Sequence, residues 1–159
     1  MVTYKKELEM YEDIIKSISK KMEFYGYDYK VFRTWKSFDP YLKSKFSLVC
    51  SILNKDTLPD IIVLYKNNEN MEKTIIIEVK KENLIAKDIA QAKLYCDVFD
   101  ADSVLLVSLI PLRKSFKEFS QKNEYFLKCA NSVQLYTCVL QDQQLQLQNS
   151  FPMGGNIFK

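Results

Sequence analysis

Hydrophobic and polar residues follow two different periods along the chain. Between residues 4 and 24, apolar residues recur every three to four positions with charged residues between them. This spacing predicts an amphipathic helix, and Gly26 is expected to end it. The same spacing returns at Asn83 and continues to Phe99, which predicts a second helix, and a third is expected over 112–130.

Shorter apolar runs between these helices predict strands. Two aliphatic runs flank the polar segment NNEN, a pattern typical of a β-hairpin. The run SVLLVSLI is apolar throughout, which indicates a buried central strand parallel to one neighbour. The expected strands cover residues 27–35, 46–53, 60–66, 73–80, 103–110 and 133–140, and LQLQ over 145–148 is expected to add an edge strand.

The core is expected in the order αβββαβαβ, to which the runs above add one further strand before the second helix, and this order predicts an α/β fold with a mixed central sheet flanked by helices. With 159 residues the chain is long enough to bury a core, and one domain over 1–150 is expected. Residues 151–159 contain Gly154 and Gly155 and are expected to form a loose tail.

Composition removes several kinds of chemistry. The chain has no histidine, which excludes Ser–His and Cys–His hydrolases and histidine-based zinc sites. Its four cysteines lack the paired spacing of a zinc or iron–sulfur site, and we expect them to be buried thiols. There is no signal peptide and no apolar run of about 18 residues, so a soluble, intracellular protein is expected, in cytoplasm or nucleus. The net charge of +3 permits a polyanionic partner without requiring one.

The expected hairpin places three charged residues near its open end. If its loop is centred on Glu69, facing residues have numbers that sum to 138, so Asp60 lies opposite Glu78. Lys80 follows two residues later and points to the same face as Glu78. A register slip of one residue would separate these side chains, so the predicted site depends on the hairpin geometry.

Two carboxylates this close repel each other unless a cation lies between them. Oxygen ligands without His or Cys suit Mg²⁺ or Mn²⁺. Such an ion polarises a phosphodiester and lowers the pKa of a bound water, while Lys80 can orient or help deprotonate that water and stabilise charge on the phosphate. The alternative is a surface network of salt bridges without catalytic function.

The motifs resemble those of a known nuclease superfamily. Pro59-Asp60, followed after a hydrophobic strand by Glu78-Val79-Lys80, resembles the PD-(D/E)XK nuclease superfamily. The segment QAKLY, from Gln91 to Tyr95, is similar to the QxxxY element of its RecB-type branch. The order αβββαβ also matches the restriction-endonuclease-like core, and the resemblance spans roughly residues 8–110.

The resemblance implies a metal-dependent deoxyribonuclease. Asp60, Glu78 and the Val79 carbonyl would bind Mg²⁺ or Mn²⁺, and Lys80 would assist the attacking water. A glutamate of the first helix often completes such sites, for which Glu12 is the first choice and Glu9 the alternative. Gln91 and Tyr95, one helical turn apart, would contact the nucleic-acid backbone.

Basic residues suggest where DNA or RNA would bind. Lys36, Lys43 and Lys45 alternate with aromatic residues and are candidates for phosphate contacts, although a solvated loop with aromatic anchors explains them equally well. The basic residues of the helix expected over 112–130 are interpreted as a solvated face. A homodimer is expected by similarity to junction resolvases.

Two other functions remain open at this point. A catalytically silent protein of the same fold could bind nucleic acid or serve in an assembly. An RNase H-like polynucleotidyl transferase would also use carboxylates, but it has no need for Lys80 two residues after Glu78.

Overall fold

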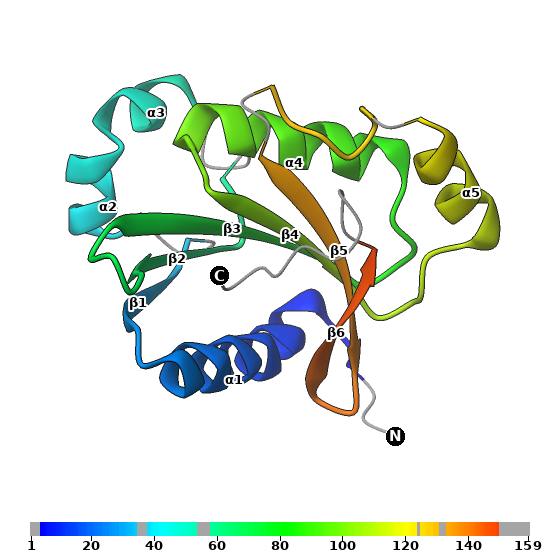
Figure 1. Cartoon of the computed structure of the whole chain (residues 1–159), viewed down its shortest axis with the longest axis horizontal. Coiled ribbons are helices and arrows are strands. Elements are labelled where there is room, and N and C mark those ends of the chain that lie inside the picture. Colours follow the sequence, from blue (N-terminus) through cyan, green and yellow to red (C-terminus); the bar gives the residue numbers. More distant parts are fainter. Residues whose placement is uncertain (1–3, 35–37, 54–57, 124, 131–132, 150–159) are drawn as a thin grey trace.

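The computed structural model of the protein describes residues 4–34, 38–53, 58–123, 125–130 and 133–149. Five helices and six strands follow one another along the described part of the chain (Figure 1). The elements are α1 (Glu7–Tyr25), β1 (Asp28–Arg33), α2 (Pro40–Lys45), α3 (Ser47–Ile52), β2 (Ile61–Lys66), β3 (Glu72–Lys80), α4 (Ala86–Phe99), β4 (Ser103–Ser108), α5 (Lys114–Lys122), β5 (Gln134–Gln141) and β6 (Gln144–Asn149).

The strands form one six-stranded mixed sheet in the order β1-β2-β3-β4-β5-β6. The pairs β1/β2, β2/β3 and β5/β6 are antiparallel, whereas β4 is parallel to both β3 and β5. All six residues of β4 are buried, which explains its continuous apolar sequence. The predicted α/β class with a mixed, helix-flanked sheet is confirmed, and so is the predicted edge strand, as β6.

The hairpin between β2 and β3 has the predicted register. Ile62 pairs with Ile76 and Leu64 with Thr74, so facing residue numbers sum to 138. The last pair at the open end is Ile61 with Ile77, and Asp60 directly precedes it. This register places the start of β2 beside the end of β3.

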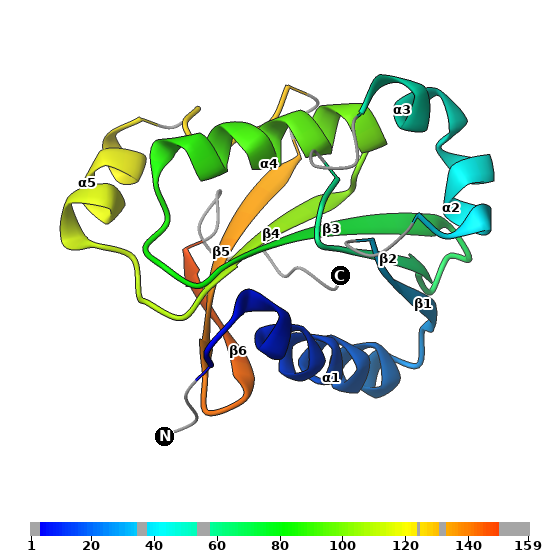
Figure 2. The ribbon, with the colours of Figure 1, turned by 180° about the vertical axis from the view of Figure 1, so that it is seen from behind.

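Alternate residues of β2 and β3 enter two separate cores, because successive side chains of a strand point to opposite faces. Ile61 and Ile77 pack with the apolar side of α1 on one face. Ile62 and Ile76 pack with α4, α2 and α3 on the other. Figures 1 and 2 show α1 on one side of the sheet and α4 on the opposite side. The end of the hairpin is therefore approached by helices from both layers.

The first helix ends as its sequence predicts. Gly26 has φ 68°, and its N–H donates to Glu23 O. Glycine adopts this left-handed conformation without the steric cost that other residues incur. The helix begins at Glu7, three residues later than expected.

The prediction of a strand over 46–53 is wrong, because Ser47–Ile52 form helix α3. Its apolar residues have one buried side and one exposed side at helical spacing. Val49 is buried, whereas Leu48 and Ile52 are 78% and 73% exposed. The preceding helix α2 has Pro40 in its first turn and Asp39 as its N-cap, accepting from Tyr41 N, an arrangement that favours a helix start.

The third predicted helix is shorter than expected. α5 ends at Lys122, where the Asn123 side chain donates to Phe119 O, and residues 125–127 form a turn. The expected strand over 103–110 likewise ends at Ser108. The expected tail over 151–159 lies outside the described residues.

Candidate metal and nucleic-acid site

Asp60 is held at the start of β2 by the end of β1. Thr34 N donates to Asp60 O at 3.1 Å, and the Thr34 hydroxyl donates to Pro59 O. Thr34 is itself only 1% exposed. These contacts fix the backbone on which the Asp60 side chain depends.

The Asp60 carboxylate accepts hydrogen bonds from two layers of the fold. The Tyr11 hydroxyl, from α1, donates to Oδ1 at 2.5 Å, and Val79 N, from β3, donates to Oδ2 at 2.7 Å. Hydroxyl donors to a carboxylate characteristically form such short bonds. A carboxylate has about four acceptor positions, so both Asp60 oxygens can still bind a further ligand.

Glu78 and Lys80 lie together on the opposite side of β3 from Val79. Lys80 Nζ donates to Glu78 Oε1 at 2.7 Å. Glu78 is only 3% exposed, and its Oε2 has no hydrogen-bond partner among the described residues. A buried carboxylate oxygen without a partner is costly, so this atom marks a position where a donor or a cation would be stabilising.

Burial raises the pKa of both the Asp60 and the Glu78 carboxyl groups. Burial and then the charge of Asp60 raise the pKa of Glu78 from 4.5 to about 7, although Lys80 opposes the change. Burial also raises the pKa of Asp60, against the hydrogen bonds from Tyr11 and Val79 N. The charge of Asp60 is thus one cause of the raised pKa of Glu78, as expected for neighbouring carboxylates.

Lys80 remains cationic in this environment. Burial alone lowers the pKa of its ammonium group, but the hydrogen bond and charge of Glu78, with the charge of Asp60, outweigh burial and raise it. The charge of Asp88 acts in the same direction. Asp88 lies in the first turn of α4, where its carboxylate accepts from Ile85 N at 2.9 Å. One lysine thus faces carboxylates from two elements.

The first helix brings Tyr11 and Glu7 toward this site instead of Glu12. Glu12 lies against Arg33 at 2.7 Å with its side chain 56% exposed, and Glu9 accepts from Lys5 N. Glu7 precedes Tyr11 by one turn, and its charge contributes to the raised pKa of both Asp60 and Glu78.

Glu7 also contacts the chain beyond β3. Its Oε1 accepts from Lys81 N at 3.1 Å, and Lys81 Nζ donates to Lys5 O at 2.9 Å. The beginning of α1 is thereby joined to the end of the strand that carries Glu78 and Lys80. The sequence offers one signal for Glu7 and Tyr11, their i, i+4 spacing, but only the packing of α1 shows which side faces the site.

Gln91 and Tyr95 lie on α4, and the charges of Glu78 and Asp60 act on Tyr95. Gln91 Nε2 donates to the Tyr95 hydroxyl at 2.6 Å. Tyr95 is fully buried, and its pKa is raised to about 12, first by burial and also by the charges of Glu78 and Asp60. Gln91 is only half-buried, so of the two it is the residue with access to solvent.

The basic residues expected to bind nucleic acid differ in their surroundings. Lys43 is exposed on α2, whereas Lys45 forms an ion pair with Glu72 and lies over the Phe46 ring. Lys36 lies outside the described residues. Two of the three predicted contacts thus belong to one short helix, and one of these is already paired with an acid.

The donor set suits a hard cation that retains water. Within the described part of the chain, no group of three or more His, Cys, Asp or Glu side chains is arranged around a metal position. Mg²⁺, however, keeps several waters and is commonly held by one or two carboxylates together with substrate phosphates. The unpartnered Glu78 oxygen beside Asp60 fits such an ion, and the absence of His and Cys ligands fits its preference for oxygen.

Comparisons with family models, curated proteins and solved structures found no match. In the ranges that the structure describes, no helix has the length and apolar character needed to cross a membrane. A cavity of about 650 Å³ lies elsewhere, between α1 and the β5–β6 hairpin, and Asp60 and Glu78 do not line it.

Proposed function

We propose that the protein is a metal-dependent deoxyribonuclease of the PD-(D/E)XK type, with a restriction-endonuclease-like core. The observation that carries this proposal is the buried, unpartnered Oε2 of Glu78 beside Asp60 and Lys80. A purely structural salt bridge has no need for a second carboxylate that raises the pKa of the first. An assembly protein without activity gains nothing from that cost.

In this proposal Asp60, Glu78 and the Val79 carbonyl hold Mg²⁺ or Mn²⁺. Such an ion, when held there, would polarise the phosphodiester and lower the pKa of a water. Tyr11 and Val79 N keep the Asp60 carboxylate in one orientation through their hydrogen bonds. Hydrolysis then forms one P–O bond to the oxygen of the attacking water, whose proton passes to solvent, and breaks the P–O bond to the leaving sugar oxygen, which takes a proton from solvent.

Lys80 serves as a cation in this reaction. Its raised pKa keeps it protonated at neutral pH, so it donates hydrogen bonds and does not accept the proton of the water. Its ammonium group can leave Glu78 to contact a phosphate oxygen, where it stabilises the charge that develops as water attacks. Burial raises the pKa of Glu78 to about 7 when no ion is bound, and a bound cation would favour its ionised form.

The proposal is tested by cleavage of supercoiled plasmid DNA with Mg²⁺ or Mn²⁺. Wild type should nick or linearise the plasmid, and Asp60→Ala and Lys80→Ala should lose this activity. Glu69→Gln, which removes an exposed carboxylate from the hairpin loop, is the matched control and should cleave like wild type. Cleavage by Asp60→Ala at the wild-type rate would overturn the proposal.

A further inference from the structure

One basic surface of the molecule lies along helix α5, where Lys114 has only an exposed ion pair with Glu118 at 3.7 Å. Helix α5 buries only Ser120, and the side chain of Lys114 is 92% exposed. From Arg113 to Lys128 the sequence has five cationic residues against two acidic ones. We define the α5 surface by its cations and its two exposed aromatic residues: Arg113, Lys114, Lys117, Lys122, Lys128, Phe119 and Tyr125.

Aromatic side chains are exposed between these cations. Tyr125 is 74% exposed and Phe119 is 50% exposed. Lys128 Nζ lies 5.9 Å from the centre of the Tyr125 ring, and Lys93 Nζ donates to Tyr125 O at 2.8 Å. Exposed aromatic side chains that occur singly need no explanation, but aromatic side chains interleaved with lysines on one element are typical of surfaces that bind nucleic-acid strands.

The aromatic residues are held in place from below. Phe126 packs against Phe119 at 4.9 Å and against Phe116 at 5.6 Å between ring centres, both edge to face. Phe116 and Phe126 in turn pack against the core that includes α4. The packing of Phe116 and Phe126 therefore holds Phe119 in place on the α5 surface.

The chain connects this surface to the candidate site. Lys80 pairs with Ser108 on the neighbouring strand β4, and α5 begins six residues later. Six residues span at most about 20 Å, and adjacent strands are about 5 Å apart. The Cα atoms of Lys114 and Lys80 are thus at most about 25 Å apart, a distance that about seven nucleotides of a strand cover.

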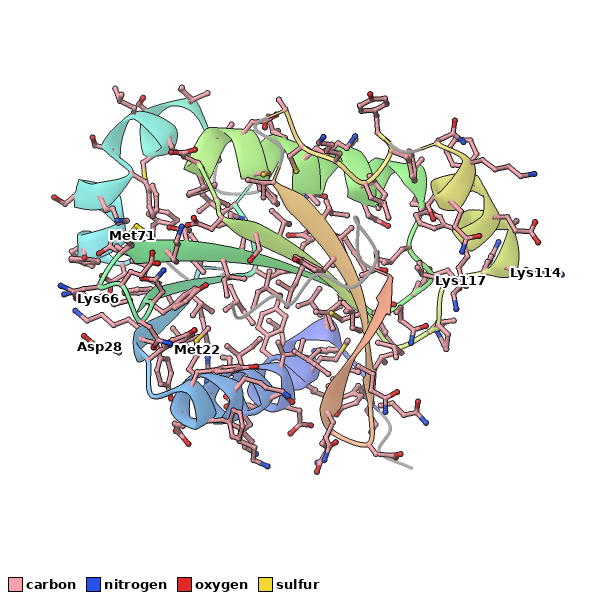
Figure 3. All side chains as sticks on the ribbon, viewed as in Figure 1. Met22, Asp28, Lys66, Met71, Lys114 and Lys117 are labelled. Atoms are coloured by element: carbon pink, nitrogen blue, oxygen red, sulfur yellow. The ribbon has the colours of Figure 1, made fainter. Side chains whose placement is uncertain are left out.

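The location of α5 agrees with this path. Figure 1 shows α5 beside the end of α4 that follows β3. Figure 3 shows Lys114 and Lys117 at the end of the molecule opposite Lys66 and Met71, which lie at the turn of the β2–β3 hairpin. The α5 surface is therefore separate from the α2 lysines considered from the sequence.

We propose that the α5 surface binds the phosphate backbone and bases of a nucleic-acid strand that extends from the Asp60–Glu78 site. This inference rests on the proposed nuclease function for its substrate, but not for its test. The lysines would contact phosphates, and Tyr125 and Phe119 would stack on bases. An acidic polypeptide would be attracted by the same charges but would not need the aromatic residues.

The test is fluorescence anisotropy of a labelled single-stranded DNA titrated with protein in EDTA, so that no cleavage occurs. Lys114→Gln/Lys117→Gln is compared with Lys20→Gln/Lys21→Gln, which removes two exposed lysines from α1 on the other side of the sheet. Loss of two phosphate contacts should reduce the slope of log affinity against log salt by about 1.4, which weakens binding about 20-fold at about 0.1 M salt.

The outcomes separate this inference from the nuclease proposal. Weaker binding by the α5 variant alone, and a further loss in Tyr125→Ala, would support the α5 surface. Equal affinity and equal salt slope for the two lysine variants would overturn it, as would equally tight binding of poly-glutamate that Tyr125→Ala leaves unchanged. The nuclease proposal is tested separately, by the loss of plasmid cleavage in Asp60→Ala with Mg²⁺, and the anisotropy comparison of the lysine variants in EDTA does not depend on that result.

Discussion

Replacing Glu78 by Gln should change how the stability of the protein depends on pH. The pKa of Glu78 is raised from 4.5 to about 7 in the folded state, first by burial and then by the charge of Asp60. Between these two values the folded state binds more protons than the unfolded state. The free energy of unfolding of the wild type must therefore fall as pH rises through this window.

The size of the effect follows from the change in pKa. Each pKa unit corresponds to about 1.4 kcal/mol, so ionisation of Glu78 should cost about 3 kcal/mol between about pH 5 and about pH 8. Glu78→Gln is uncharged at both values and should not show this loss. Asp60, Lys80, Glu7 and Tyr95 also face Glu78 electrostatically, so the difference between wild type and variant isolates the effect better than either profile alone.

The assay is urea unfolding followed by circular dichroism at about pH 5 and about pH 8, with EDTA present. Glu69→Gln serves as the control, because Glu69 is exposed in the hairpin loop. From about pH 5 to about pH 8 the free energy of unfolding of wild type should fall by about 3 kcal/mol, and that of Glu78→Gln should not show this fall. The same pH dependence in wild type and Glu78→Gln would refute the reasoning.

Three further predictions concern the site and helix α1. Adding Mg²⁺ at about pH 8 should raise the melting temperature of wild type but not of Glu78→Gln, because an ion that binds only the folded state stabilises it; equal shifts would contradict this. Tyr11→Phe and Tyr4→Phe should each lower the free energy of unfolding by about 2 kcal/mol in urea, since each removes a hydroxyl donor to a carboxylate, but only Tyr11→Phe should weaken Mn²⁺ binding. Gly26→Ala should cost about 1 kcal/mol in thermal unfolding from its φ of 68° alone, because an added Cβ meets nothing within 4 Å; an unchanged melting temperature would contradict this.

The hairpin register could be predicted because both the loop and the strands specify it. The polar loop sets the centre, and a slip of one residue would move Ile62 and Ile76 to the wrong face. Asn67 adds a constraint that the pattern does not show, since its side chain accepts from the backbone N–H of Glu69 and Met71. The proximity of Asp60 to Val79 depends on this register.

The segment 46–53 was harder to predict because its apolar run fits either period. A continuous apolar run resembles a buried strand, and only its tertiary environment decides. In α3, Val49 is buried against the core, whereas Leu48 and Ile52 remain exposed. Only one side of this helix therefore packs against the core. The Asp39-Pro40 pair was the available signal for a helical region.

The residues contributed by α1 could not be predicted from spacing alone. Several glutamates recur along the helix, and a rotation of 100° per residue determines which one faces the sheet. Burial of Tyr11 at 4% exposure sets that rotation and turns Glu12 toward Arg33. The hydrogen bond from Tyr11 to Asp60 needs tertiary packing across 49 residues of sequence.

The claim that Asp60 and Glu78 form one divalent-cation site is tested most directly by calorimetric titration with Mn²⁺ at about pH 8, where both carboxyl groups can ionise. Wild type and Glu69→Gln should bind Mn²⁺ with the same affinity, and Asp60→Asn and Glu78→Gln should each lose most of that binding. Binding by Asp60→Asn and Glu78→Gln that equals wild type, or no binding by wild type, would contradict the account.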